Sequence, residues 1–326
     1  MTIMGIPESM ASGPFTAEEA AAAGVSARRL HDLVRAGWVR QPFFGVYLRA
    51  DVADDTHSRA RAAAQVMPPH GVVVDRSAAA LHGIEMFDLA ENDVPPRLEV
   101  VSTGGQPSRR TGVFGGKRDL VPEEVMELGG VRVTTPLRTA CDIACLRGRP
   151  RALATLDAFR TAFDIDEADL RAILPRYVGR RGVIQLREMI PLSRAGVDSP
   201  PESWIRLEIH DDGYPMPATQ SSTFVPGWGM VRLENAYSSL RIAVEYDGEQ
   251  HHSEAEDRAR DSARRAALLA VGWRVIVVRR DGLSGPGRDR WIEEFRRAFA
   301  DRAPYPLRKR VYARSLQQSR RGRKPR

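Results

Sequence analysis

Acidic residues gather at the end of one predicted strand, residues 241–247. The run Arg-Ile-Ala-Val-Glu-Tyr-Asp alternates as a strand does, so Glu245 and Asp247 share one face. Glu234, on the preceding predicted strand, lies opposite them if the hairpin through residues 238–239 is tight. Two carboxylates about 5 Å apart repel by roughly 3 kcal/mol at an effective dielectric near 20. The group therefore requires a cation, a protonated member or raised pKa values.

Two histidines follow the same strand. Gly248 ends the strand and is followed closely by His251 and His252, while Glu202 can approach from a helix that opens at Ser199. This set of oxygen and nitrogen donors suits Mg²⁺ or Mn²⁺. Such an ion offsets the carboxylate repulsion and can activate water for attack on a phosphodiester. Two other interpretations stay open: the alternation is that of any half-exposed strand, and Glu202 occupies a capping-box position.

The elements that must position these groups follow the order α, β, β, β, α, β. Because a crossover helix precedes the last strand, this order predicts a mixed sheet. A further helix is predicted at 289–300. The expected elements are a helix from Ser199 to about Asp211, strands near 218–225, 230–237 and 241–247, a helix over 254–271, and a buried strand over 273–278.

The beginning of the chain predicts a winged helix-turn-helix over residues 14–50. Thr16-x-x-Glu19 is a capping box, and Ser26-x-x-Arg29 opens a second helix. The following stretch, residues 38–48, is rich in aromatic and β-branched residues and predicts a two-stranded wing. In such a module the second helix enters the major groove. The candidate DNA-binding residues here are Arg28, Arg29, Arg35 and Arg40; the alternative is a small structural subdomain with solvated arginines.

The segment 56–190 predicts an α+β connector with little chemistry of its own. Cys141 and Cys145, four residues apart, indicate two buried small hydrophobic side chains rather than a zinc or disulfide site. His82, at the end of a predicted helix, is expected to cap it. The Gly-, Ser- and Arg-rich piece at 103–118 is expected to be a loop.

Charge is concentrated at the end of the chain. The 326 residues contain 49 basic and 42 acidic side chains, a net charge of +7, but residues 308–326 hold nine basic and no acidic ones. Such a block cannot fold alone and predicts an arm that binds nucleic acid. An anionic membrane surface is an alternative partner, but the tail has no amphipathic face that would favour membrane binding. The candidate contacts are Arg308, Lys309, Arg310, Arg320 and Arg321.

The chain has no run of 18 apolar residues and no basic, then apolar, leader at its start. A cytoplasmic protein without a membrane segment is therefore expected. Its composition, 42% hydrophobic and 28% charged, excludes disorder throughout. The predicted class is a multidomain α+β and α/β protein with a winged helix (1–50), an α+β connector (51–195), a mixed sheet flanked by helices (196–303) and a basic tail (304–326).

The C-terminal residues resemble domains of unknown function related to very-short-patch-repair endonucleases, within the PD-(D/E)XK nuclease superfamily. The resemblance implies that Glu234 and Glu245 hold Mg²⁺ or Mn²⁺, and that His251 or His252 is the general base. Glu202 and Asp247 become further ligands or water-orienting groups. Glu234 stands where the family usually has Asp, and Asp247 takes the place of the motif lysine. The matching residues are Glu202, Glu234, Glu245-Tyr-Asp-Gly-x-x-His251-His252, Arg260-Asp261, Arg265, Leu268 and Gly272-Trp-Arg-Val.

The first half of the chain contains four short patterns. Two lie in the winged-helix part, Gly24-Val-Ser-x-x-x-Leu30 and Arg40-x-x-x-x-Gly45-Val-Tyr. Two more follow, Arg76-Ser-Ala-Ala-Ala-Leu-His-Gly83 and Thr135-Pro-x-Arg-Thr-Ala-Cys-Asp142. With these patterns, this half of the chain resembles AbiEi-type antitoxins of abortive-infection systems. The resemblance implies duplex DNA and a cognate toxin as partners.

Three functions follow from these patterns. The leading one is Mg²⁺-dependent cleavage of DNA in phage defence or DNA repair. The second is a non-enzymatic, antitoxin-like repressor whose nuclease fold only binds DNA. The third is a scaffold that binds a protein toxin or RNA.

Overall fold

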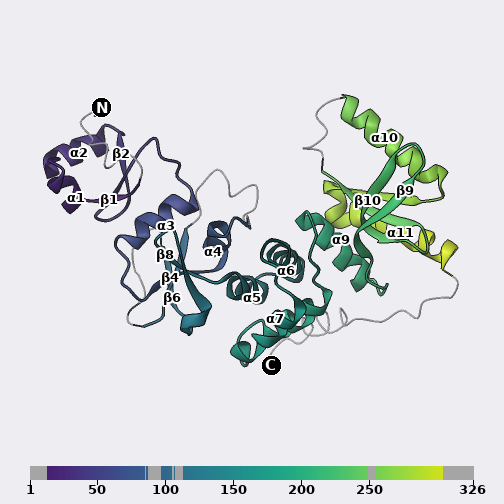
Figure 1. Cartoon of the computed structure of the whole chain (residues 1–326), viewed down its shortest axis with the longest axis horizontal. Coiled ribbons are helices and arrows are strands. Elements are labelled where there is room, and N and C mark those ends of the chain that lie inside the picture. Colours follow the sequence, from purple (N-terminus) through teal and green to yellow (C-terminus); the bar gives the residue numbers. More distant parts are fainter. Residues whose placement is uncertain are drawn as a thin grey trace, which may run out of the picture. The chain divides into compact units, whose positions relative to one another are not determined.

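The computed structural model describes residues 13–84, 86, 97–104, 106, 113–248 and 255–303. The chain divides into two compact units, Met1–Ile143 and Ala144–Arg326 (Figure 1). The four-part division expected from the sequence is finer than this and stays a prediction. Among the described residues, no helix combines the length and the apolar character that crossing a bilayer requires.

The first unit begins with the fold of a winged helix. Strand β1 (Phe15–Thr16) is followed by helices α1 (Ala17–Ala22) and α2 (Ala27–Arg35), then β2 (Val39–Phe43) and β3 (Val46–Arg49), in the antiparallel order β1-β3-β2. Both predicted caps form: the Thr16 hydroxyl accepts from the Glu19 amide and the Ser26 hydroxyl from the Arg29 amide, each at 3.2 Å. The two helices and the hairpin of the wing are confirmed.

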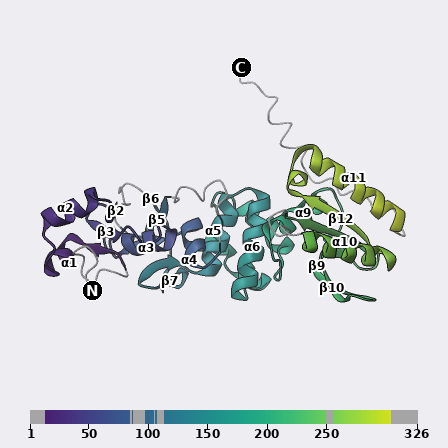
Figure 2. The ribbon, with the colours of Figure 1, turned by 90° about the horizontal axis from the view of Figure 1, so that it is seen from above.

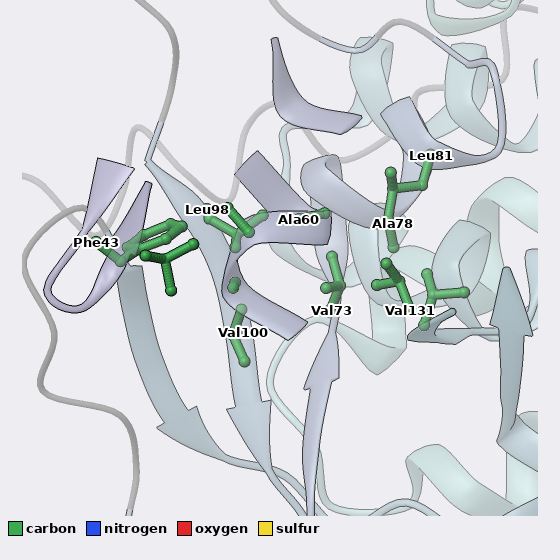
Figure 3. Close-up of a cluster of buried hydrophobic side chains, with 12 residues drawn as sticks. Phe43, Ala60, Val73, Ala78, Leu81, Leu98, Val100 and Val131 are labelled. Carbon is green, nitrogen blue, oxygen red and sulfur yellow. The ribbon is translucent and has the colours of Figure 1, made fainter. Parts of the chain in front are cut away.

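A five-stranded sheet forms the rest of this unit, in the order β6-β5-β4-β8-β7. All three residues of β4 are buried, as expected for a central strand. Phe43 of the wing joins the same hydrophobic cluster as Ala60 and Leu98 (Figure 3). The elements are α3 (Thr56–Ala64), β4 (Gly71–Val73), α4 (Asp75–Leu81), β5 (Leu98–Ser102), β6 (Val113–Lys117), η3 (Pro122–Glu124), β7 (Val125–Leu128), β8 (Val131–Thr134) and α5 (Pro136–Leu146).

Two expectations for this region need correction. The segment 103–118 is not all loop, because Val113–Lys117 pairs in parallel with β5 despite its two glycines. Cys141 is buried as expected, but Cys145 is only half-buried. His82 does cap α4, and its Nε2 lies 2.8 Å from the carbonyl oxygen of Thr134.

Arg138 and Asp142 of the Thr135–Asp142 pattern belong to a charge network with Asp75, Arg118 and Glu124. Arg118 lies 2.8 Å from Asp75 and 2.9 Å from Asp142, and Arg138 donates to Asp142 at 2.8 Å and also pairs with Glu124. Asp75 begins α4 with a left-handed φ of 52°. The network joins α4, α5 and the segment between them.

The second unit opens with helices. The buried carboxylate of Asp157 on α6 accepts hydrogen bonds from Ser203 (2.6 Å) and Arg206 on α9, which ties these helices together. The elements are α6 (Arg149–Phe163), α7 (Glu167–Ala172), η4 (Leu174–Tyr177), α8 (Val183–Met189), η5 (Ile190–Leu192) and α9 (Pro200–Asp211).

A four-stranded mixed sheet completes this unit, in the order β12-β11-β10-β9, with β11 and β12 parallel and the other pairs antiparallel. Helices α9 and α11 lie on one face of the sheet and helix α10 on the other (Figure 2), and their apolar side chains form two clusters with the strands. The α, β, β, β, α, β order is confirmed, although α11 begins earlier than expected. The elements are β9 (Ala218–Val225), β10 (Gly229–Tyr237), β11 (Ile242–Asp247), α10 (Ala255–Ala270), β12 (Arg274–Arg279), η7 (Arg280–Leu283) and α11 (Gly285–Arg302).

Candidate functional site

The four carboxylates singled out from the sequence lie around one cavity of about 330 Å³ at the α10 side of this sheet. Glu245 and Asp247 come from β11, Glu234 from β10 and Glu202 from α9. Asp198, Gln220, Arg232, Asp261, Arg264 and Arg265 also line it. The predicted convergence of the four acids is therefore present, while His251 and His252 lie outside the described residues.

Arg264 holds the central carboxylate of this cavity, that of Glu245. Its Nη1 and Nη2 donate to the two oxygens of Glu245 at 3.0 and 2.8 Å, and Nη2 also donates to the Arg232 carbonyl oxygen at 3.0 Å. The Glu245 side chain is 10% exposed and that of Arg264 is 23% exposed, so the two-pronged pair is largely shielded from water. A guanidinium therefore occupies the position beside Glu245 where a metal ion would have to bind.

Asp247 is likewise engaged by arginines. Arg265 Nη2 lies 3.2 Å from its Oδ2, and Arg279 Nε lies 3.8 Å from the same atom. Arg265 also pairs with Asp261 one helical turn away on α10. The face that the strand alternation predicted for Glu245 and Asp247 is thus covered by basic residues of α10.

The other two acids are held by neutral donors. The Tyr246 amide donates to Glu234 Oε2 at 2.7 Å, and Glu202 accepts from the Ser199 hydroxyl at 2.9 Å and from Gln220 Nε2 at 2.7 Å. Burial, helped by the nearby charges of Glu202 and Glu245, raises the pKa of Glu234 to about 8. Burial also raises the pKa of Glu202. Proton uptake at Glu234 is a second way in which this cavity limits its negative charge.

Sequence reasoning missed Arg232, Arg264 and Gln220, and it named Arg265 only as a position that matches the nuclease-like family. Arg264 has one local signal, its spacing of three from Asp261, but its bond to Glu245 depends on how α10 packs on the sheet. Gln220 adopts a left-handed φ of 49° at the point where the β9–β10 pairing skips a register position. Such a conformation is uncommon outside glycine, and here it accompanies the bond from Gln220 to Glu202.

These contacts decide how well the cavity suits a divalent ion. Among the described residues, no three His, Cys, Asp or Glu side chains are placed to hold one metal ion. Both oxygens of Glu245 accept from Arg264, and Oε2 of Glu234 accepts from the Tyr246 amide. In this arrangement the donor set does not fit Mg²⁺ or Mn²⁺, and it is an ion-paired cluster instead.

We expect the protonation of Glu234 to make stability depend on pH. Its pKa of about 8 in the folded chain exceeds the value of 4.5 for an ordinary glutamate, so the folded state binds more protons between these values. The free energy of unfolding should therefore fall as pH rises from about 4.5 to about 8. Glu234→Gln keeps an acceptor for the Tyr246 amide and should be more stable than the parent by about 2 kcal/mol or more at pH 8.5.

Urea unfolding followed by tryptophan fluorescence at pH 5 and pH 8.5 checks this expectation. The two proteins should differ little at pH 5 and diverge at pH 8.5. A constant difference between the parent and Glu234→Gln across this range would show that Glu234 does not titrate there.

A second candidate site is the outer surface of α2. Leu30 and Leu33 are buried against the winged-helix core, whereas Arg28, Arg29 and Arg35 are exposed. Arg40 differs from them, because its Nη2 donates to the Ala53 carbonyl oxygen at 3.0 Å and lies near Asp54. The structure thus brings three of the four arginines to a solvent-facing helix surface and places the fourth against the segment before α3.

Comparison with known proteins gives the class of this chain. A family model described as "Transcriptional regulator, AbiEi antitoxin" matches residues 8–50, and one described as "AbiEi antitoxin C-terminal domain" matches residues 71–192. The chain belongs to the AbiEi antitoxin and transcriptional regulator family.

Within this class, two uncharacterized proteins of Mycobacterium tuberculosis are similar to it, Rv2248 of strain H37Rv and MT2308 of strain CDC 1551. Each is 31% identical over 256 residues, which cover 78% of this chain and 91% of the relative. The matched family regions end before the acidic cavity, whose lining residues begin at Asp198.

Proposed function

We propose that this protein is a non-enzymatic regulator that binds duplex DNA through its winged helix, with α2 in the major groove. The observation that carries the proposal is the match of residues 8–50 to an AbiEi regulator, which coincides with a helix that buries leucines and exposes arginines. Arginine reads guanine edges and binds phosphates, so the exposed side of α2 has the required chemistry.

Arginines that reach base edges should contribute sequence preference. Arg28→Ala or Arg35→Ala should weaken binding to a preferred duplex by about 1–3 kcal/mol and relax the preference for it. Fluorescence anisotropy on preferred and scrambled duplexes measures both effects. Arg187→Ala, an exposed arginine of the second unit, is the matched control and should change neither. Equal losses on every duplex would mean that the α2 arginines contact phosphates only.

The basic tail should add affinity without preference. Arg308, Lys309, Arg310, Arg320 and Arg321 lie outside the described residues, and the proposal for them rests on their charge. If about half of the nine cations neutralise phosphates, truncation after Pro306 should make the slope of log K against log salt shallower by about 4. Titrations at several salt concentrations measure this slope. Identical slopes for both proteins would show that the tail does not touch DNA.

The region matched by the antitoxin domain, residues 71–192, is the proposed contact for a protein toxin. A toxin encoded beside this gene would then co-purify with the full chain. It should also co-purify with the Arg28→Ala variant, because that change affects only the DNA-binding helix.

A metal-dependent nuclease is the second candidate. It is favoured by one observation, the convergence of Glu202, Glu234, Glu245 and Asp247 on a single cavity. Cleavage would require Arg264 to release Glu245. Incubation of plasmid DNA with the full chain and Mg²⁺ or Mn²⁺ tests it: metal-dependent nicking that is lost in Glu245→Ala would favour the nuclease, and intact plasmid would favour the regulator.

A further inference from the structure

Strand β9 forms an open edge of the four-stranded sheet. In the described part of the chain it pairs with β10 on one side and with no strand on the other. It spans eight residues, Ala218–Val225, and is longer than any other edge strand that the structure describes. The backbone groups along its outer side are therefore available to a further strand.

The composition of β9 distinguishes it from the other edge strands among the described residues. Its sequence, Ala-Thr-Gln-Ser-Ser-Thr-Phe-Val, contains no charged residue and no proline. Such residues, or a very short strand, normally prevent an edge from pairing with another chain. The other described edges all have one of these features: β1 has two residues, β2 contains Arg40 and Pro42, β6 contains Lys117, β7 contains Glu127, and β12 contains Arg274 and Arg279.

An exposed apolar pair lies at one end of this open edge. Phe224 of β9 and Met230 of β10 are directly opposite each other in the ladder, and they are 66% and 67% exposed. Their neighbours Val225 and Val231 point to the other face, where they join Leu268 of α10 in a buried cluster. The hairpin therefore presents a large aromatic side chain and a thioether to solvent beside its unpaired backbone.

The charges near β9 do not oppose the approach of an identical strand. Among the residues of β10 that pair with β9, one is charged, Arg232, which lies opposite Ser222. Arg232 forms an ion pair with Asp198 and donates to Gln220 Oε1 at 2.7 Å. Its charge is thus balanced within the chain, and two copies of β9 would meet without like charges directly opposite each other.

A second copy of this chain is the partner that fits a neutral, open edge of this kind. Two identical strands that pair antiparallel are related by a two-fold axis, the commonest symmetry of homo-oligomers. This pairing uses the open edge of each copy, so the assembly closes at two chains. An edge without charges and prolines is then protected by the partner.

We infer that the chain forms a homodimer in which β9 pairs antiparallel with β9 of a second copy. The two four-stranded sheets become one continuous sheet, and Phe224 of each copy packs against the partner's β9. The inference goes beyond the proposed DNA binding and does not depend on it, because β9 lies outside the winged helix.

Sedimentation equilibrium of the full chain tests the association. An interface built on one strand pair is small for a stable protein contact, so we expect a dissociation constant of about 1–50 μM. A salt concentration of about 0.5 M removes nucleic acid that could bridge two chains through their basic tails. A chain that is still monomeric at about 500 μM, tenfold above the upper value, would overturn the inference.

Variants place the association at β9. Ser222→Lys brings two like charges to the paired strands, and Phe224→Glu replaces an apolar contact by a charge. Each should raise the dissociation constant about tenfold or more. Ser239→Lys in the β10–β11 turn and Leu269→Glu on α10, both exposed in the same unit, are the matched controls and should leave it unchanged. Thermal unfolding verifies that all four variants fold. A dimer that both β9 variants leave intact would contradict the assignment.

Hydrogen exchange locates the interface without any substitution. The amides of β9 should exchange more slowly at protein concentrations above the dissociation constant than below it, because dimerisation hydrogen-bonds or covers them. Strand β12, the other edge of the same sheet, should exchange equally at both concentrations. Exchange in β9 that does not depend on protein concentration, in a chain that dimerises, would overturn the inference.

Discussion

Asp157→Ala should lower the free energy of unfolding of the Ala144–Arg326 unit by about 3–5 kcal/mol. Asp157 and Arg206 are 1% and 0% exposed, and the carboxylate also accepts from the Ser203 hydroxyl and from the Arg194 amide at 2.7 Å. Burial raises the pKa of Asp157 and lowers that of Arg206 despite their attraction, so desolvation outweighs the pairing. Removing Asp157 then leaves the buried guanidinium of Arg206 without the carboxylate that it pairs with.

Urea unfolding followed by tryptophan fluorescence measures this loss, since Trp204, Trp228, Trp273 and Trp291 all lie in this unit. Glu167→Ala, which breaks the exposed pair with Arg171, is the matched control and should cost at most about 1 kcal/mol. Asp157→Leu combined with Arg206→Met should cost less than Asp157→Ala alone, because no charge is stranded. A loss within 1 kcal/mol for Asp157→Ala would show that the pair does not hold α6 to α9.

Arg264→Ala should convert the acidic cavity into a site that binds Mn²⁺. The change removes the counter-ion of Glu245, which lies in the same cavity as Glu234 and Asp247. In the absence of metal, the variant should therefore be less stable than the parent. If it binds Mn²⁺ with a Kd near 10 μM, 1 mM Mn²⁺ stabilises it by about 2.7 kcal/mol. For a unit of this size that corresponds to a rise in Tm of about 5–10 °C.

Thermal unfolding with and without Mn²⁺ makes the comparison, and the parent protein should not shift. Arg290→Ala, an exposed arginine paired with Asp281, serves as the control and should behave as the parent does. A parent protein that is stabilised by Mn²⁺ as strongly as the variant would mean that Arg264 does not occupy the cation position. That result would favour the nuclease.

The helix caps and strand alternation were readable from the sequence because they depend on neighbouring residues. Thr16 and Ser26 bond within their own turns, and Glu245 and Asp247 share a face through the two-residue period of a strand. The antiparallel pairing of β10 with β11 then brings Glu234 beside them, as expected from a tight hairpin.

What the sequence did not predict depends on contacts between distant segments. In the sequence, Arg264 is one of several basic residues on a polar helix. Its contact with Glu245 arises only from the packing of α10 on the sheet. The segment Val113–Lys117 contains two glycines and has weak strand propensity, but its backbone pairing with β5 makes it a strand. The expected metal site took no account of α10: the acids do converge, and Arg264 and Arg265 of this helix pair with Glu245 and Asp247.

The negative charge of the acidic cavity is balanced in two ways. Arg264, Arg265 and Arg232 neutralise part of the charge, and the proton on Glu234 removes more below pH 8. The two contributions differ in their response to conditions, since the arginines stay charged at any physiological pH while Glu234 does not.

The central claim, sequence-selective binding of duplex DNA by α2, is tested most directly by selection. A pool of random duplexes is incubated in EDTA with the full chain and with the Arg28→Ala/Arg29→Ala/Arg35→Ala variant, and the retained duplexes are sequenced. We expect the parent to enrich one motif and the triple variant to enrich none while retaining weak, salt-sensitive binding. The absence of an enriched motif for the parent, or the same motif for the variant, would contradict the account.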